Sequence, residues 1–231
     1  MEIKKLEWDS QFFGFPVGDV FIENESSFSG ILNSNIFTFF QVRSESLIDI
    51  ISDTHSLSHC ETKTVFSKNL NGNSYVDISI TDFDDEPIAE NSFYNLAYES
   101  GKWSRYKQDK NIAEDKFQEL YQLWIRNSIN KSFASKFFYI KENENILAFV
   151  TFKIKDNLAQ IGLIAVSPNS QGKGLGKNIL LKVENYCFQN NIKTLLIPTQ
   201  LENEAACNFY LKMGYKISGK IVVKHFWKNS N

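Results

Sequence analysis

A glycine-rich segment at residues 161–176 has the composition of an anion-binding loop. It reads IGLIAVSPNSQGKGLG: an apolar run typical of a strand, then a polar turn with glycines at positions 172, 174 and 176. Glycine lets the backbone approach a ligand closely, and the N-terminus of a following helix carries partial positive charge. The segment can therefore present several backbone N–H groups to one anion, such as a phosphate group.

Two common phosphate-binding motifs do not fit this spacing. The dinucleotide motif G-x-G-x-x-G fails because its third glycine would fall on Lys177. The P-loop motif fails because Gln171 stands where it needs its first glycine and Asn178 where it needs serine or threonine. Taken alone, the segment is also compatible with a plain strand–turn–helix connection whose glycines permit tight packing.

The turn resembles motif A of the GNAT superfamily of N-acetyltransferases, whose pattern Q/R-x-x-G-x-G/A falls on Gln171, Gly174 and Gly176. That resemblance implies a loop that holds the pyrophosphate of acetyl-coenzyme A. A second segment, residues 203–215, is similar to the superfamily pattern N-x-x-A-x-x-x-Y-x-x-x-G. The residues expected to contact the coenzyme are Ile164, Val166, Gln171, Gly172, Lys173, Gly174, Leu175, Gly176, Lys177, Asn203 and Tyr210.

The implied reaction is attack of a neutral amine on the thioester carbonyl of acetyl-CoA. Negative charge that grows on the carbonyl oxygen needs donors, and we expect the backbone N–H groups of Ile164 and Ala165 to supply them if a bulge splays the strand. Tyr210 matches the general acid of the superfamily and would protonate the leaving thiolate. A core aromatic is the alternative for Tyr210, and Asn203 would serve equally well as a helix cap.

The proton acceptor for the amine is not identified by either motif. None of the three histidines, at positions 55, 59 and 225, lies in the two matched segments. Glu99 and Glu184 are candidates, and water is an alternative carrier of the proton.

The N-terminal segment at residues 6–14, LEWDSQFFG, is similar to bacterial TDP-fucosamine acetyltransferases, as are residues 104–106, 123–127, 160–163 and 199–203. This resemblance implies N-acetylation of TDP-4-amino-4,6-dideoxygalactose for surface-polysaccharide assembly. The rival functions are acetylation of a protein or another small amine, and coenzyme A binding without catalysis.

Three residues are candidates for binding that acceptor. Arg105 has the planar guanidinium that suits a substrate pyrophosphate, and Tyr106 and Trp124 offer rings on which a base or sugar can stack. A solvated arginine and two core aromatics would explain the same residue types.

The elements around these motifs indicate an α/β protein. The resemblance implies the GNAT fold, a mixed and mostly antiparallel sheet flanked by helices, with a smaller N-terminal α/β domain. An acidic stretch that ends at Pro87 predicts a boundary, which divides the chain into an acceptor-side domain at 1–85 and an acetyl-CoA domain at 86–231. Apolar spacing also predicts a helix over 44–52, a loop over 101–106 and a strand or hairpin over 215–227.

Composition narrows the classes of partner. The 231 residues carry a net charge of −2 and no basic block, which argues against a nucleic-acid binder. No apolar run is long enough for a membrane span and the first eight residues lack a signal core, so we expect a cytoplasmic protein. We expect no metal, because His55, His59 and Cys60 have no second ligand cluster. The expected partner is a nucleotide-sugar substrate, and a homodimer is left open.

Overall fold

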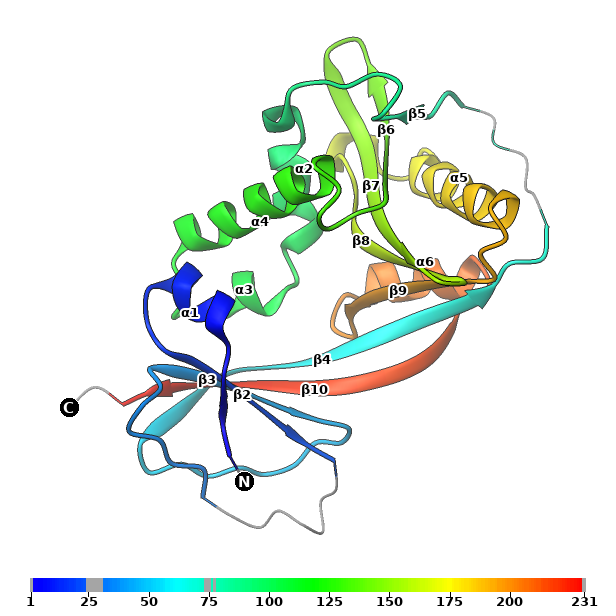
Figure 1. The fold of residues 1–231 in the computed structure, drawn as a ribbon. Helices are drawn as coiled ribbons and strands as arrows, with labels where there is room; N and C mark the ends of the chain where they lie inside the picture. The colour runs from blue at the N-terminus through cyan, green and yellow to red at the C-terminus, as the bar shows by residue number, and fades with distance from the viewer. Residues whose placement is uncertain (1, 24–30, 73–75, 77, 230–231) are drawn as a thin grey trace.

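The computed structural model describes residues 2–23, 31–72, 76 and 78–229. Over these residues ten strands form one sheet in the order β1-β2-β3-β10-β4-β9-β8-β7-β6-β5. Its neighbours run antiparallel except for the parallel pairs β2–β3 and β8–β9. Figure 1 shows that the sheet twists along its length and carries helices on both faces.

The first part of the chain contributes strands to both halves of this sheet. Its elements are β1 (Lys4–Lys5), α1 (Glu7–Phe13), β2 (Val17–Ile22), β3 (Phe39–Ser44), β4 (His55–Asn69) and β5 (Thr81–Asp82). The long strand β4 lies between β10 and β9, in the interior of the sheet. Residues on either side of position 85 therefore share one sheet, while their division into two domains stays a prediction.

The remainder of the chain supplies the helices and the other strands. These elements are η2 (Glu90–Phe93), α2 (Tyr94–Gly101), α3 (Arg105–Gln108), α4 (Glu114–Ile129), β6 (Lys136–Glu142), β7 (Asn145–Lys155), β8 (Leu158–Val166), η3 (Pro168–Ser170), α5 (Leu175–Gln189), β9 (Thr194–Gln200), α6 (Glu204–Lys212) and β10 (Lys216–Lys228).

Helices α5 and α6 cover one face of the sheet. In α5 the buried residues Ile179, Val183 and Cys187 are one helical turn apart, so they form one apolar stripe. The stripe packs on β6, β7 and β9, and Tyr210 of α6 joins the same cluster. Burial of each large apolar side chain stabilises this face by about 2 kcal/mol.

Helices α2 and α4 cover the opposite face. Phe117, Tyr121 and Ile125 of α4 repeat every four residues and are buried together with Leu96 of α2. They pack on side chains of β6, β7 and β8. The sheet therefore lies between two separate hydrophobic cores, one under each helix layer.

Strand β8 contains a bulge at Gly162. Its pairing with β7 shifts register between Thr151 and Phe152, so that Gly162 is the extra residue, and the Leu163 N–H donates to Thr151 Oγ1 at 3.0 Å. A side chain at Gly162 would place its Cβ 3.0 Å from that oxygen, which explains the glycine. The bulge turns the side chains: Ile161 faces the α5 layer, whereas Leu163 faces the α2 layer.

Two expectations from the sequence are wrong in detail. Residues 47–50 have no regular structure, so the helix expected over 44–52 is absent; Ile48 is instead buried against β2 and β3. The loop expected over 101–106 contains the start of α3, which begins at Arg105. Of the two alternatives expected over 215–227, the strand is confirmed: β10 is a single strand that pairs with β3 on one side and β4 on the other.

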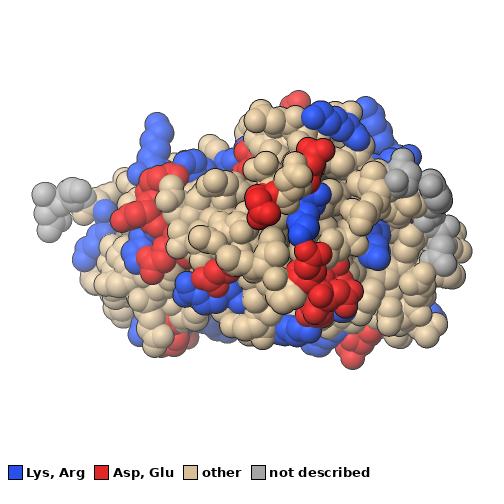
Figure 2. Space-filling model, turned by 90° about the horizontal axis from the view of Figure 1, so that it is seen from above, with Lys and Arg blue, Asp and Glu red and all other residues tan. Residues whose placement is uncertain are grey.

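The surface carries mixed charge. On the face that Figure 2 shows, Lys and Arg side chains are interspersed with Asp and Glu. Among the described residues, no helix has the length and apolar character needed to cross a membrane.

Candidate active site

The sheet opens between β8 and β9 after three residue pairs. The parallel pairs are Leu158–Thr194, Ala159–Leu195 and Gln160–Leu196, and no further β8–β9 pair occurs within the described residues. From Ile161 onward, β8 is therefore bonded to β7 alone, and its other edge faces a gap. Exposed N–H and C=O groups at such an edge are free to bind a ligand.

The ladder with β7 fixes which amides face this gap. The Ser167 N–H donates to the Leu147 carbonyl at 2.7 Å, and the register then continues without a break through Ala165 and Ile164. Hydrogen-bonded and non-bonded pairs alternate in an antiparallel ladder, so the Ala165 amide points to β7 while those of Ile164 and Val166 point to the gap. Consistently, the Val166 carbonyl accepts from the Gln171 side chain at 3.2 Å. The expectation that Ala165 donates to the ligand is corrected on this ground.

The glycine turn after β8 leads directly into α5. Gly172 and Gly174 have φ of +76° and +80°, a left-handed conformation that glycine adopts without a Cβ penalty. No side chain of the described residues caps α5, whose first hydrogen bond runs from the Asn178 N–H to the Gly174 carbonyl at 3.0 Å. The amides of residues 175–177 therefore have no intrahelical acceptor, and at the positive end of the helix they form a candidate anion site.

Gly176 marks the point where this turn, β8 and α6 converge. A Cβ built at Gly176 would lie 3.5 Å from Val166 Cγ2 and 3.7 Å from Phe209 Cζ. The anion site is thus next to the open end of β8 and to the helix that carries Tyr210. The structure thus brings Val166 and Gly176 next to α6, the helix that carries Tyr210.

Tyr210 is 5% exposed and its ring packs against Phe66 and Tyr215. Burial raises the pKa of its hydroxyl, so it stays protonated at neutral pH and can act as a proton donor. No hydrogen bond to this hydroxyl is found among the described residues, which leaves it available. Asn203 caps α6 by accepting from the Ala206 N–H at 3.2 Å, and its contact with the coenzyme stays a prediction.

The three residues expected to bind the acceptor lie together on the other face of the sheet. Arg105 donates from Nη2 to the Tyr106 hydroxyl at 2.8 Å and lies 4.5 Å from the centre of that ring. The Tyr106 ring contacts both Trp124 of α4 and Phe13 of α1. The N-terminal segment, α3 and α4 therefore converge at this side of the gap.

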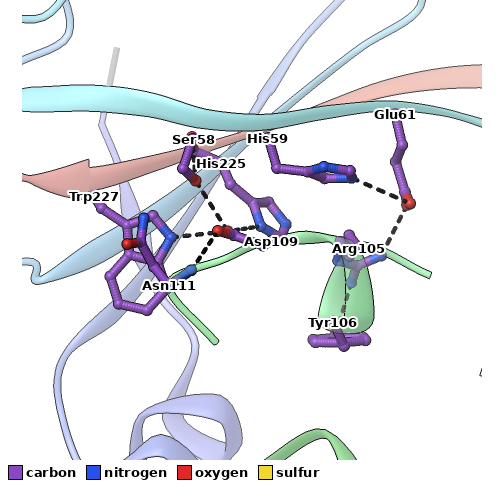
Figure 3. A network of polar contacts seen from close by, with 9 residues as sticks. All are labelled: Ser58, His59, Glu61, Arg105, Tyr106, Asp109, Asn111, His225 and Trp227. Carbon is purple, nitrogen blue, oxygen red and sulfur yellow. Dashed lines mark hydrogen bonds and ion pairs between the residues drawn. The ribbon is translucent and has the colours of Figure 1, made fainter. Parts of the chain in front are cut away.

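A buried carboxylate beside α3 was not anticipated from the sequence. Oδ2 of Asp109 accepts from the Ser58 hydroxyl at 3.0 Å, from Trp227 Nε1 at 2.9 Å and from His225 Nδ1 at 2.7 Å (Figure 3). Its Oδ1 accepts from the Asn111 N–H at 3.1 Å. Burial by itself would raise the pKa of Asp109, but these hydrogen bonds outweigh burial and hold the pKa below its usual range.

A second buried carboxylate, Glu61 of β4, lies next to it. Its oxygens are 3.8 Å from His59 Nε2 and 3.7 Å from Arg105 Nη1, beyond hydrogen-bond distance (Figure 3). Neither Glu61 oxygen has a hydrogen-bond partner among the described residues, and the same holds for His59 Nε2, Arg105 Nε and His225 Nε2. Buried polar atoms normally have partners, so this cluster is where a ligand or water belongs.

Only a weak signal for this cluster exists in the sequence. His59 and Glu61 are two residues apart, a spacing that puts both side chains on one face of a strand. Asp109 and His225 are 116 positions apart in the chain. His225 lies opposite His59 because β10 pairs with β4, and Asp109 joins them because α3, which it follows, packs on β4.

Glu184 and Glu99, the two candidate bases from the sequence, form ion pairs with lysines. The Glu184 carboxylate accepts from Lys68 at 2.8 Å and from the Tyr215 hydroxyl at 2.8 Å, on the α5 side of the sheet. Glu99 forms an ion pair with Lys102 within three residues. Glu184 is therefore part of a structural ion pair and not of the acceptor-side cluster.

A comparison with models of known protein families identifies the family of this chain. The model of the "Acetyltransferase (GNAT) family" matches residues 92–215, more than half of the chain. This chain belongs to the GNAT family of acetyltransferases. The GNAT family uses acetyl-CoA, and the predicted α/β class and GNAT fold are confirmed for this chain.

Curated proteins with similar sequences include one from polysaccharide biosynthesis. The GNAT chain is 28% identical over 142 residues to the Bacillus subtilis spore coat polysaccharide biosynthesis protein SpsD, a match that covers 62% of the chain and 49% of SpsD. It spans about half the length of the curated relatives it matches.

Solved structures share the fold at low identity. A conserved Staphylococcus epidermidis protein of unknown function superposes with a TM-score of 0.57 at 13% identity, over 84% of this chain and 74% of its own. A GCN5-related N-acetyltransferase from Sphaerobacter thermophilus gives a TM-score of 0.50 at 10% identity, over 84% and 62% of the two chains. Within the described ranges, no three or more His, Cys, Asp or Glu side chains are placed so that together they could hold a metal ion.

The conformation of the turn predicts a selective effect of Gly174→Ala. Alanine at φ +80° costs about 1 kcal/mol, and relief of that strain would tilt the amides that face the anion. We expect the dissociation constant for acetyl-CoA, measured by calorimetry, to rise about tenfold.

Gly14→Ala is the matched control, because Gly14 has the same φ and open space around it but caps α1. It should lose similar stability and keep its acetyl-CoA affinity. Equal loss of affinity in both variants would contradict the assignment of the turn.

Proposed function

We propose that this acetyltransferase N-acetylates the amine of a nucleotide-linked amino deoxysugar, with TDP-4-amino-4,6-dideoxygalactose as the expected acceptor. The observation that carries the proposal is the packing of the N-terminal segment, through Phe13, against Tyr106 at the acceptor side of the gap. The segment that resembles amino-sugar enzymes is thus part of the wall of the acceptor site. The relative SpsD, a polysaccharide biosynthesis protein, supports the same substrate class.

The donor half of the proposed reaction uses the α5 side of the sheet. The amides of residues 175–177 bind the coenzyme pyrophosphate, and the gap between β8 and β9 admits the pantetheine arm. The Ile164 N–H binds the thioester carbonyl and stabilises the charge that grows on its oxygen. Tyr210 donates its proton to the departing thiolate.

The acceptor half needs positive charge for a diphosphate. Burial lowers the pKa of Lys63, and the charges of Arg105 and Arg43 lower it further, while Glu61 opposes them. A lysine destabilised by neighbouring cations is favoured by an anion, so Lys63 and Arg105 are suited to the diphosphate. The rings of Tyr106 and Trp124 can then stack on the base or sugar. The homodimer and the cytoplasmic location expected from the sequence stay predictions.

The proposed reaction predicts the turnover of wild-type protein and of a Tyr210 variant. With acetyl-CoA and TDP-4-amino-4,6-dideoxygalactose, the protein should release free thiol, and Tyr210→Phe should lower kcat about 100-fold because the thiolate loses its proton donor. Acetyl-CoA affinity in calorimetry should be nearly unchanged.

Tyr186→Phe is the control, since Tyr186 packs in the same core on α5 through its ring alone. It should turn over normally. Undiminished turnover of Tyr210→Phe would remove this residue from the mechanism, and lack of thiol release with every 4-amino nucleotide sugar would refute the substrate class.

A further prediction tests whether Lys63 binds the nucleotide part of the acceptor or its sugar. Lys63→Met should raise KM for the nucleotide-linked acceptor about tenfold with little change in kcat, because it removes binding that ground state and transition state share. For the same amino sugar without its nucleotide, KM should not change. An equal effect on both acceptors would show that Lys63 does not bind the diphosphate.

A further inference from the structure

The face of the sheet on which α3 packs continues over β10, β3 and β2, and it carries polar side chains there. We propose that Arg43 of β3 holds the diphosphate of the acceptor together with Lys63 of β4, so that the nucleotide extends over β3, away from the gap. The inference rests on the nucleotide-sugar function proposed above. It assigns a site to the part of that substrate that does not react.

The strand register places these side chains on one face. His225 of β10 lies opposite both His59 of β4 and Gln41 of β3, and residues directly opposite each other in antiparallel strands point to the same side. Side chains alternate along a strand, so Arg43 shares this face with Gln41, and Lys63 shares it with His59. Arg43 and Lys63 therefore lie on the face that α3 partly covers.

The spacing of the strands lets both cations reach one ligand. Val223 of β10 lies opposite Arg43, and Ile221, the next β10 residue on the same face, lies opposite Lys63. With about 4.8 Å between strands and about 6.8 Å between same-face residues, the Cα atoms of Arg43 and Lys63 are about 12 Å apart. The floor between them is apolar, and the two long side chains can close on a diphosphate above it.

The guanidinium of Arg43 is held in place and still presents one edge. Its Nε donates to Asp19 Oδ1 at 2.7 Å and its Nη2 donates to Asp19 Oδ2, while Gln41 Nε2 donates to Asp19 Oδ1 at 2.9 Å. The Phe21 ring centre lies 5.5 Å from the guanidinium carbon. Nη1 has no hydrogen bond or ion pair among the described residues, and the side chain is 41% exposed. A guanidinium fixed in this way loses little entropy when it binds a phosphate oxygen.

The carboxylates of this face lie beneath its cations. Asp19 is 8% and Glu61 is 2% exposed, whereas Lys63 is accessible from solvent and forms no hydrogen bond or ion pair with the described residues. Neighbouring atoms still crowd Lys63: burial lowers its pKa, the charges of Arg105 and Arg43 lower it further, and Glu61 opposes them. An anion between Arg43 and Lys63 would relieve the repulsion of these cations.

The strand order gives the direction in which the acceptor lies. Lys63 pairs with Gln200 of β9, the strand that borders the gap, whereas Arg43 lies two strands farther away, across β10. A sugar whose amine reaches the thioester at the gap thus leaves its diphosphate over Lys63 and Arg43. The nucleoside then extends over β3 and β2, which gives these N-terminal strands a role in acceptor binding.

Calorimetry with TDP tests this site, in the presence of saturating acetyl-CoA so that the turn before α5 is filled. Arg43→Met should raise the dissociation constant for TDP about tenfold, because the diphosphate loses a charge-assisted hydrogen bond. Arg43→Lys keeps the positive charge but lacks the guanidinium fork, and it should raise the constant about threefold or more. Both variants should keep the acetyl-CoA affinity of wild-type protein, which reports that they are folded.

Arg126→Met is the matched control. Arg126 is also an exposed arginine in an ion pair, with Nη2 at 3.1 Å from Glu90 Oε1, but it lies on α4 and outside this face. Its dissociation constant for TDP should stay within about twofold of wild type, because loss of a surface ion pair alone costs little.

The outcomes separate this inference from the proposed function. If the Arg43 variants lose TDP affinity but wild-type protein releases no thiol with any 4-amino nucleotide sugar, the proposed reaction fails and the diphosphate site stands. If thiol is released but wild-type protein binds no TDP, or the Arg43 variants bind TDP as tightly as wild type, only the inference fails. A loss of TDP affinity matched by an equal loss of acetyl-CoA affinity also overturns the role of Arg43.

Discussion

The separation of β8 from β9 is the constraint on which the rest of the site depends. Two parallel strands in the interior of a sheet would normally hydrogen-bond along their length, because an unpaired backbone group there is costly. Here the ladder stops after Gln160, and the bulge at Gly162 redirects the strand. The amides of Ile164 and Val166 are left at an open edge within a sheet that is otherwise continuous.

This gap connects two faces with different chemistry. On the α5 side, the glycine turn supplies backbone donors and a helix N-terminus, and Tyr210 supplies a protonated hydroxyl. On the α3 side, carboxylates, histidines and cations face one another with several buried atoms unpaired. Each such atom costs about 1–3 kcal/mol unless a ligand or water satisfies it. The long β4–β10 ladder and the aromatic cluster under α4 hold these groups in place.

The donor side could be predicted from the sequence because its determinants are local. The strand at Leu158–Val166, the glycine turn and the cap at Asn203 each depend on residues within about one element of one another. The direction of the Ala165 amide could not be predicted, because it follows from the register with β7. The buried charged cluster on the acceptor side was missed, because its residues are distant in the chain: Glu61 and His225 meet through pairing of β4 with β10, and Asp109 reaches them from the end of α3. The failed helix at 44–52 has the same cause, since contacts with β2 and β3 override its local apolar spacing.

Amide hydrogen exchange of β8, followed by NMR with and without saturating acetyl-CoA, tests the role of the gap most directly. The Ile164 and Val166 amides should exchange readily in the free protein and slow about tenfold or more with acetyl-CoA, because the coenzyme supplies their missing acceptors. The Ala165 amide, bonded to β7, should be protected in both states. Protection of Ile164 and Val166 in the free protein, or no change on addition of acetyl-CoA, would contradict the account.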